Sequence, residues 1–378
     1  MNILLLAGTG TLGRHISDLL SMNGHAVYIT SRRVKENKDN MHYYKGNPHD
    51  NNFLKSIINE QQSWDVIMDF MVYTTSEFKE KVNLFLDNCS QYIFFSSARV
   101  YANSMHALTE TSLRLLDVSE DQKFLSTDDY ALCKARQENI LFEQEKTNYT
   151  IVRPYITYGE DRLQLGIQEH ETWLRRALNG KHIILQREIA ESITTLTYAG
   201  DVAKAVCSLI GNQIALGEVF NITTSESVKW IDVLKIYLDV LEQKMNKRPK
   251  VKIIIGDKSL DCYQAKYDRL FTRTFDNTKI SNIISGDSFM SASFGLKMCL
   301  EKFLEYPVYR NLPFNWRQEA FMDQVSGDSY PLKEIESLKD KWSYTIFRYT
   351  PYQILDVLRF FKNKIIQVSQ VQLAGFNL

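Results

Sequence analysis

The stretch Gly8-Thr9-Gly10-Thr11-Leu12-Gly13 follows a short apolar run, Ile3 to Ala7, and precedes a segment with helical spacing of apolar residues. An apolar run of this length is typical of a strand buried on both faces of a parallel sheet. G-x-G-x-x-G between a strand and a helix predicts a turn whose amides face a pyrophosphate at the helix N-terminus. We therefore expect dinucleotide binding here, and a purely structural glycine turn is the alternative.

Downstream of this turn, short apolar runs alternate with segments of helical periodicity. Apolar residues from Leu12 to Leu20 predict the first helix, which Asn23-Gly24 ends. Further strands are predicted over residues 25–30, 65–70, 92–95 and 150–153, and further helices over 76–88 and 130–144. Such alternation predicts a doubly wound parallel α/β sheet whose ligands lie beyond the carboxyl ends of the strands.

The pattern becomes less regular after about Glu160. We expect a nucleotide-binding domain over 1–160, to which 193–225 return, and a smaller mixed α/β subdomain on the substrate side over 161–310. A helical C-terminal extension is expected over 311–378. Within it, residues 351–368 predict an amphipathic helix with basic flanks. Docking on the chain itself or on a sister subunit is the ordinary role of such a helix, and peripheral membrane contact is the alternative.

The composition is that of a globular chain of 378 residues with 44% hydrophobic content. Its 45 basic and 45 acidic residues give zero formal net charge, so nucleic acid is not expected as a partner. Five widely spaced cysteines without a Cys-x-x-Cys pair fit a reducing cytosol. The seven histidines show no ligand spacing, so no metal is expected. No segment has the pattern of a signal peptide or the ~20 apolar residues of a membrane span, and we expect a cytoplasmic protein.

The end of the second predicted strand bears on the cofactor. It reads Thr30-Ser31-Arg32-Arg33, without the acidic residue that usually bonds the ribose hydroxyls of NAD. Ser31 and the two guanidiniums are instead available for a 2'-phosphate. NADP(H) is therefore favoured over NAD(H), with a solvated loop end as the alternative.

Tyr130 and Lys134 lie four residues apart and hence on one face of a helix. A phenol with a pKa of about 10 is a poor base unless a nearby cation stabilises its phenolate, which Lys134 would do. Ser126 or Thr127 is expected to cap this helix. Ser97 ends a buried strand at the ligand edge of the sheet, where its hydroxyl would bond a substrate oxygen. Each motif alone also fits a solvated helix face or a capped strand end.

Together these segments resemble the extended short-chain dehydrogenase/reductase family of nucleotide-sugar epimerases, dehydratases and reductases. Gly46-Asn47-Pro48-His49-Asp50 resembles the adenine-side loop of the family, Arg153 to Gly159 its Arg-Pro-x-x-x-Tyr-Gly turn, and Gly200-Asp201-Val202-Ala203 its Asp-Asp-Val-Ala helix start. The resemblance implies a Rossmann-type fold and an enzyme that is usually a homodimer. It also implies Ser97 as the substrate-orienting hydroxyl, Tyr130 as general acid/base and Lys134 as the ribose contact. The cofactor contacts it implies, beyond the glycine loop and residues 31–33, are Asn47, Phe70, Met71, Tyr130, Lys134, Pro154 and Tyr155.

Departures from the family pattern narrow the expected activity. Ala98-Arg99 follow Ser97 where dehydratases carry Asp-Glu, which argues against dehydration. Residues 65–73 resemble a poorly defined branch that includes chloroplast stem-loop-binding proteins. The expected function is an NADP(H)-dependent reductase of a keto-sugar, and the expected substrate is a nucleotide-linked 4-keto-6-deoxy sugar for surface polysaccharide. The alternatives are an NAD(P)-dependent nucleotide-sugar 4-epimerase and a non-catalytic NADP-binding or RNA-binding protein.

Overall fold

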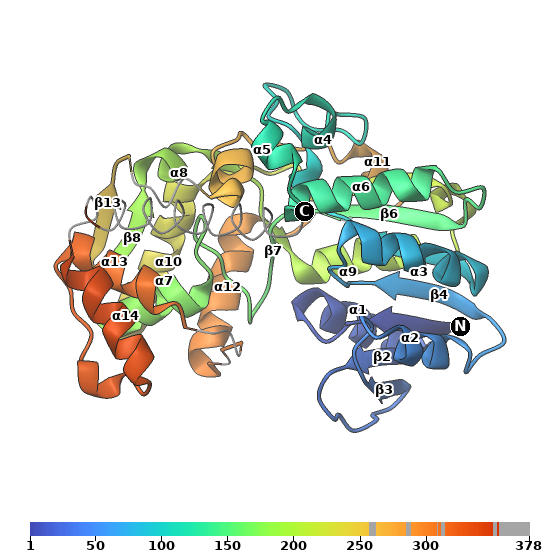
Figure 1. Cartoon of the computed structure of the whole chain (residues 1–378), viewed down its shortest axis with the longest axis horizontal. Coiled ribbons are helices and arrows are strands. Elements are labelled where there is room, and N and C mark those ends of the chain that lie inside the picture. The colour runs from blue at the N-terminus through green and yellow to red at the C-terminus, as the bar shows by residue number, and fades with distance from the viewer. Residues whose placement is uncertain (257–261, 285–288, 308, 311–313, 351–353, 355–378) are drawn as a thin grey trace, which may run out of the picture. The chain divides into compact units, whose positions relative to one another are not determined.

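The structure is a computed structural model that describes residues 1–256, 262–284, 289–307, 309–310, 314–350 and 354 (Figure 1). The chain divides into two compact units. The first comprises Met1–His170, Leu185–Arg248 and Ile254–Tyr309, and the second comprises Glu171–Ile184, Pro249–Ile253 and Arg310–Leu378.

The first unit is built on a seven-stranded sheet in which every strand pairs with its neighbours in parallel. The strand order is β11-β6-β5-β4-β1-β2-β3. The chain leaves the central β1 toward β3 at one edge and then crosses to β4, so the direction of winding reverses between β1 and β4. The predicted doubly wound sheet is confirmed. The strands are β1 (Asn2–Leu6), β2 (Ala26–Ser31), β3 (Met41–Lys45), β4 (Trp64–Asp69), β5 (Cys89–Phe95), β6 (Tyr149–Pro154) and β11 (Glu218–Ile222).

Helices cover both faces of this sheet and enclose two cores (Figure 1). Successive side chains of a strand point to opposite faces, so Ile3 and Leu5 join one core while Leu4 and Leu6 join the other. This is why the first strand reads as an unbroken apolar run. The covering helices are α1 (Thr11–Met22) and α9 (Ala199–Cys207) on the first core, and α2 (Asn51–Ile58), α3 (Thr75–Asp87) and α6 (Tyr130–Phe142) on the second.

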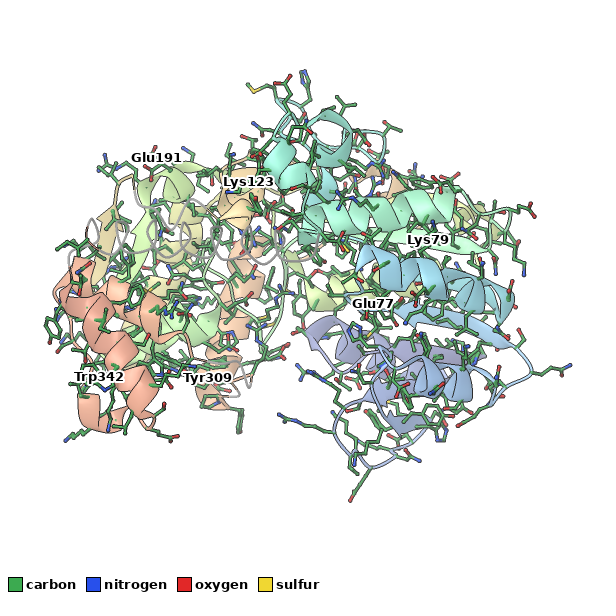
Figure 2. The ribbon with its side chains drawn as sticks, in the orientation of Figure 1. Glu77, Lys79, Lys123, Glu191, Tyr309 and Trp342 are labelled. Atoms are coloured by element: carbon green, nitrogen blue, oxygen red, sulfur yellow. The ribbon has the colours of Figure 1, made fainter. Side chains whose placement is uncertain are left out.

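The helix starts obey local capping rules, with one correction to the sequence prediction. α6 is capped by Asp129, whose side chain accepts from the Ala131 amide, and not by Ser126 or Thr127. Those two residues instead follow a separate short helix, α5 (Gln122–Leu125). α3 begins with a capping box between Thr74 and Glu77, which Figure 2 labels.

Strand β3 and helix α2 were not predicted. β3 is an edge strand with half-buried aromatic residues, so it lacks the apolar run that marks the central strands. The remaining elements of the first unit are shorter or lie beyond the sheet: η1 (Ala98–Val100), α4 (Leu115–Val118), β7 (Thr157–Tyr158) paired with β10 (Thr197–Tyr198), α8 (Arg187–Glu191), β9 (Ile193–Thr194) paired with β12 (Val228–Lys229), η2 (Gln213–Ala215), α10 (Trp230–Met245), η4 (Ala265–Arg269), α11 (Thr278–Ser281) and α12 (Ala292–Glu305).

The second unit joins helices around a buried ion cluster. Arg176 donates to Glu319 (2.7 Å) and Asp323 (2.8 Å), and Lys181 donates to the same two carboxylates. Tyr344 also donates to Asp323, at 2.6 Å. The elements here are α7 (His170–Leu178), β8 (Ile183–Gln186), β13 (Val251–Ile254), α13 (Trp316–Ser326), η5 (Leu332–Glu334) and α14 (Leu338–Tyr349).

The C-terminal region is helical as expected, through α13 and α14. The amphipathic helix predicted over 351–368 lies outside the described residues except for Ile354. Among the helices that the structure describes, none has the length and apolar content that crossing a membrane requires.

Candidate active site

The predicted glycine turn joins β1 to α1. A Cβ on Gly13 would lie 2.3 Å from the Gly8 carbonyl oxygen, and a Cβ on Gly8 would lie 2.7 Å from the Leu5 Cβ, so packing requires both glycines. Gly10 is different, because a Cβ there would meet no atom within 4 Å. Gly10 is also the N-cap of α1, and no side chain caps the helix amides. The turn therefore leaves space and donors for an anion at the N-terminus of a long helix, which fits a pyrophosphate.

The other residues of the turn support its shape. Thr9 and Thr11 are half-buried, and Leu12 packs against the core. Ala7, just before the turn, has a φ of 58°, and its amide donates to the Thr30 hydroxyl at 2.7 Å. An alanine in the left-handed region is strained, because its Cβ crowds the backbone.

The ends of β2 and β3 bring the predicted adenosine-side residues to one edge of the sheet. Ser31 pairs in register with Lys45, so the residues after each strand lie at the same edge. Ser31 is buried, and its hydroxyl accepts from the Arg33 amide at 3.2 Å. Arg32, Arg33 and Asn47 are all exposed there, which leaves both guanidiniums open to a ligand.

Beyond β4, the backbone turns around a buried carboxylate that sequence reasoning missed. Asp69 accepts from the Tyr92 hydroxyl at 2.6 Å and from the Met71 amide at 2.9 Å, through different oxygens. Phe70 stacks on Phe95 with ring centroids 4.1 Å apart. Burial raises the pKa of Asp69, whereas the charge of Lys134 and the hydrogen bonds from Tyr92 and Met71 act to lower it. Its position immediately after an apolar strand run was the available signal.

Lys134 points at the same turn. Its Nζ donates to the Met71 carbonyl at 3.1 Å, lies 4.5 Å from the centre of the Phe94 ring, and is almost wholly buried. Burial lowers the pKa of Lys134 to about 8, although the charge of Asp69 acts to raise it. Lys134 thus lies beside the winding reversal between β1 and β4, where ligands bind in this class of sheet.

Tyr130 is the first residue of α6, one turn before Lys134, and is half-buried. Burial raises the pKa of its phenol, whereas the charge of Arg99, a hydrogen bond with the Ser97 side chain and the charge of Arg162 act to lower it. The structure therefore places the Ser97 side chain at the phenol of Tyr130. Arg99 and Arg162 were not predicted at the phenol.

One turn further along α6, Glu138 ties the helix to the strand ends. It is fully buried and accepts from the Ser96 hydroxyl (2.5 Å) and from Arg153 through both oxygens (2.7 Å each). Arg114 donates to it at 3.2 Å. Tyr130, Lys134 and Glu138 thus form one helical face, of which sequence reasoning recognised only the first two.

Pro154 and Tyr155 follow at the end of β6. Two guanidiniums lie near the buried ring of Tyr155, with their carbons 6.0 Å (Arg269) and 5.9 Å (Arg273) from the ring centre. Burial raises the pKa of the Tyr155 phenol to about 12. The next residue, Ile156, has a φ of 31°, unusual for a β-branched side chain.

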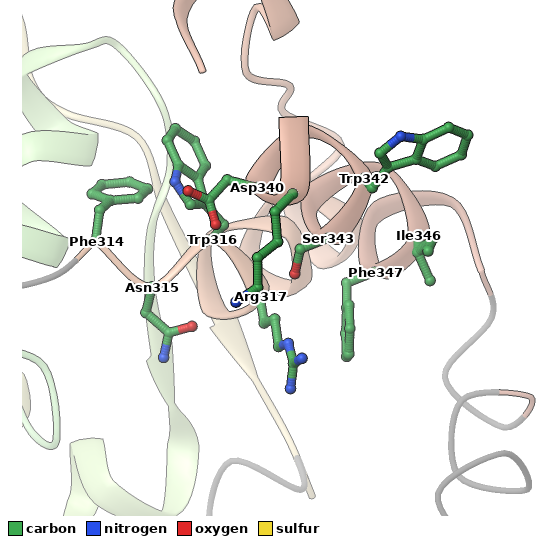
Figure 3. Close-up of a pocket in the computed structure, with 10 residues that line it drawn as sticks. Phe314, Asn315, Trp316, Arg317, Asp340, Trp342, Ser343, Ile346 and Phe347 are labelled. Atoms are coloured by element: carbon green, nitrogen blue, oxygen red, sulfur yellow. The ribbon is translucent and has the colours of Figure 1, made fainter. Parts of the chain in front are cut away.

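A separate groove of 590 Å³ lies in the second unit between the start of α13 and α14 (Figure 3). Aromatic side chains and a similar share of polar and charged ones line the groove, and none of the predicted site residues is among them. Its lining residues are Phe314, Asn315, Trp316, Arg317, Lys339, Asp340, Trp342, Ser343, Ile346 and Phe347.

Comparison with known proteins identifies related sequences. The model of the NAD dependent epimerase/dehydratase family matches residues 3–223. The chain is 25% identical over 249 residues to the chloroplast stem-loop binding protein of 41 kDa b of Arabidopsis thaliana, across 62% of this chain and 61% of the relative. The chain thus spans less than two thirds of that relative. It is 22% identical over 328 residues to a UDP-N-acetyl-α-D-glucosaminuronate decarboxylase of Bacillus cytotoxicus, across 80% of this chain and 97% of the relative.

Solved structures share the fold. A dTDP-glucose 4,6-dehydratase from Bacillus anthracis in complex with NAD matches with a TM-score of 0.62 and 16% identity, across 81% of this chain and 97% of the other. A UDP-glucuronic acid 4-epimerase from Bacillus cereus, in complex with UDP-glucuronic acid and NAD, matches with a TM-score of 0.59 and 16% identity, across 81% and 99%.

Proposed function

Because the chain belongs to the NAD dependent epimerase/dehydratase family, we propose that it is an NADP(H)-dependent reductase of a keto-sugar linked to a nucleotide. In this proposal Ser97, Tyr130 and Lys134 carry the chemistry. The glycine turn, Ser31 to Arg33, Asn47, Phe70, Met71, Pro154 and Tyr155 hold the cofactor.

The observation that carries the proposal is the phenol of Tyr130 beside the Ser97 hydroxyl. Burial raises the pKa of Tyr130, so the phenol keeps its proton at neutral pH and can give it to a carbonyl oxygen. Ser97 would donate to the same oxygen and stabilise its developing charge. Lys134 would hold the ribose and favour the phenolate that the proton transfer leaves. A bound nicotinamide cofactor supplies the hydride.

The preference for NADP(H) rests on Arg32 and Arg33. Both are exposed beyond β2, where their guanidiniums would pair with a 2'-phosphate. The solved structures named above hold NAD, so this preference is a separate part of the proposal. A nucleotide-linked sugar as substrate is supported by the enzymes of dTDP- and UDP-sugars among the similar proteins. The 4-keto-6-deoxy sugar expected from the sequence is one member of that class.

A nucleotide-sugar 4-epimerase is the second candidate, and the similarity to a UDP-glucuronic acid 4-epimerase favours it. It would use the same Ser97, Tyr130 and Lys134. An epimerase keeps its cofactor between two half-reactions, whereas a reductase exchanges it at every turnover. Cofactor that stays with the protein through purification and dialysis would favour the epimerase, and freely exchanging cofactor would favour the reductase.

A binding protein of the same fold is the third candidate, because the Arabidopsis relative is named for stem-loop binding. Such a protein should shift a stem-loop RNA at low salt and lose it steeply as salt rises. The balanced charge of the chain speaks against this role.

The test of the reductase is Tyr130→Phe. NADPH oxidation is followed at 340 nm with 4-keto-6-deoxy sugar nucleotides and wild-type protein. We expect the variant to lose about 10²- to 10⁴-fold in turnover, because it lacks the proton donor. NADPH binding, measured by fluorescence titration, should persist. Tyr306→Phe, at an exposed position after α12, is the matched control and should retain turnover. Equal turnover by Tyr130→Phe and wild type would refute the assignment of Tyr130.

A further inference from the structure

The guanidinium of Arg99 lies against the ring of Tyr130. Arg99 belongs to η1, the short helix that begins after Ser97. Its guanidinium carbon lies 5.2 Å from the centre of the Tyr130 ring. Arg162 lies in the loop after β7, and its charge also acts on the pKa of this phenol. The amide of Arg99 donates to the Ser97 hydroxyl at 3.2 Å, so Arg99 is fixed relative to Ser97.

Neither guanidinium is well paired. The Nε of Arg99 lies 3.6 Å from an oxygen of Asp268, within ion-pair range but beyond a normal hydrogen bond. Arg162 has its Nη2 at 3.8 Å from Glu169. The Nε of each is buried and finds no hydrogen-bond partner within the part of the chain that the structure describes. Buried donors of charged groups are ordinarily satisfied, so these are available to a ligand.

Asp268 does not neutralise Arg99, because other arginines already use it. Arg269 donates to one of its oxygens, and the Nε of Arg273 lies 3.2 Å from the other. Arg273 is fully buried and also donates to the carbonyls of Tyr101 (2.9 Å) and Ala102 (3.1 Å). Three arginines thus share one carboxylate, and the cluster beside Tyr130 carries excess positive charge. The side chain of Arg99 is 18% exposed, so it is open to the site.

From this arrangement we infer that Arg99 binds a carboxylate on the carbon next to the reacting carbon, so the substrate is a nucleotide-linked uronic acid. The inference rests on the proposed function and specifies its substrate. A guanidinium presents paired donors that match a carboxylate. Ser97 and Tyr130 hold the reacting oxygen, so a group that reaches Arg99 must lie within a few bonds of the reacting carbon.

The ring geometry of a sugar selects the position of this carboxylate. In a hexose that reacts at C4, the nucleotide diphosphate is attached across the ring at C1, whereas C6 is carried by the neighbouring C5. A carboxylate at C6 is therefore the anion closest to Tyr130. The 6-deoxy sugar expected from the sequence carries a methyl group there, which offers no acceptor to Arg99, and it becomes the weaker substrate.

The test compares UDP-glucuronate with UDP-glucose, which share nucleotide, diphosphate and ring and differ only at C6. Calorimetric titrations in the presence of NADP⁺ give their dissociation constants. We expect wild-type protein to bind UDP-glucuronate about 10- to 100-fold more tightly, the range of a charge-assisted hydrogen-bonded pair. Arg99→Gln should abolish this preference while UDP-glucose binding stays constant. Arg99→Lys, which keeps the charge but loses the paired donors, should retain part of it.

Arg248→Gln is the matched control, because Arg248 is exposed and pairs with Asp239 and Glu242. The preference of Arg248→Gln for UDP-glucuronate over UDP-glucose should equal that of wild type. Thermal melts should show that every variant is folded. Equal binding of the two sugars by wild type, or no binding of either, would overturn the inference. An equal loss of affinity for both sugars in Arg99→Gln would also overturn the inference, because it would assign the guanidinium to the diphosphate that the two sugars share.

The inference and the proposed function fail in different ways. NADPH formation from NADP⁺ with UDP-glucose and UDP-glucuronate at equal efficiency would sustain the redox function and overturn the carboxylate site. A binding preference that depends on Arg99, without NADPH formation, would sustain the carboxylate site and count against the redox function.

Discussion

Replacing Asp69 by asparagine tests how the site keeps Lys134 charged. Asp69 is buried at the end of β4, and Lys134 donates to the carbonyl of Met71 in the same turn. The carboxylate raises the pKa of Lys134, against the larger lowering caused by burial. Asparagine has nearly the same shape and still accepts a hydrogen bond, so the substitution removes the charge more than the packing.

The magnitude follows from the pKa of Lys134, which is about 8 in the wild-type site. About nine tenths of the lysine is then protonated at pH 7. A nearby opposite charge shifts a pKa by about 1 to 3 units, so its loss should lower the pKa of Lys134 to roughly 5–7. Between about half and about 99% of the lysine would then be neutral at pH 7, and kcat/KM would fall about two- to ninetyfold there. Because the active form is protonated, the loss should shrink as the pH falls toward about 5.

The assay is a profile of kcat/KM against pH from 5.5 to 9.5, with NADPH oxidation as the readout. In wild type, activity should decline as the pH rises through about 8, because Lys134 then loses its proton. In Asp69→Asn the decline should begin at lower pH, while Asp65→Asn on the solvent side of β4 should leave the profile in place. An unchanged descending limb in a folded Asp69→Asn protein would refute the reasoning.

Three further outcomes follow from other parts of the structure. Arg32→Gln combined with Arg33→Gln should weaken NADPH binding by about 10- to 100-fold in a fluorescence titration, since only NADPH carries the 2'-phosphate. NADH binding should stay constant. Equal effects on both cofactors would contradict the assignment of Arg32 and Arg33 to the 2'-phosphate. Ala7→Gly should raise the free energy of unfolding by up to about 1 kcal/mol in a denaturant titration, because relief of the left-handed conformation exceeds the entropy gained by the unfolded chain. Arg176→Met should destabilise the second unit by about 3 to 5 kcal/mol, because the buried carboxylates of Glu319 and Asp323 lose a partner. Amide hydrogen exchange in α13 should then accelerate. Exchange protection equal to that of wild type would show that Lys181 alone compensates the two carboxylates.

The sequence predicted the features that depend on residues close together in the chain. The glycine turn between β1 and α1 follows from local stereochemistry, and the spacing of Tyr130 and Lys134 follows from the helical repeat. The central strands were recognisable because both faces of the sheet are buried, which makes their apolar runs continuous. The edge strand β3 lacked that signal and was not predicted.

Only the tertiary structure decided what surrounds these groups. The charge of Asp69 acting on Lys134, the position of Glu138 between Arg114 and Arg153, and the unsatisfied Nε of Arg99 all depend on residues brought together from distant segments. The sequence displayed Arg99 as a departure from the family pattern, but its charge balance depends on how Arg269 and Arg273 occupy Asp268. Local periodicity fixes the face on which a side chain lies, whereas burial and the choice of partner are set by packing between elements. Protonation and substrate preference depend on those two properties.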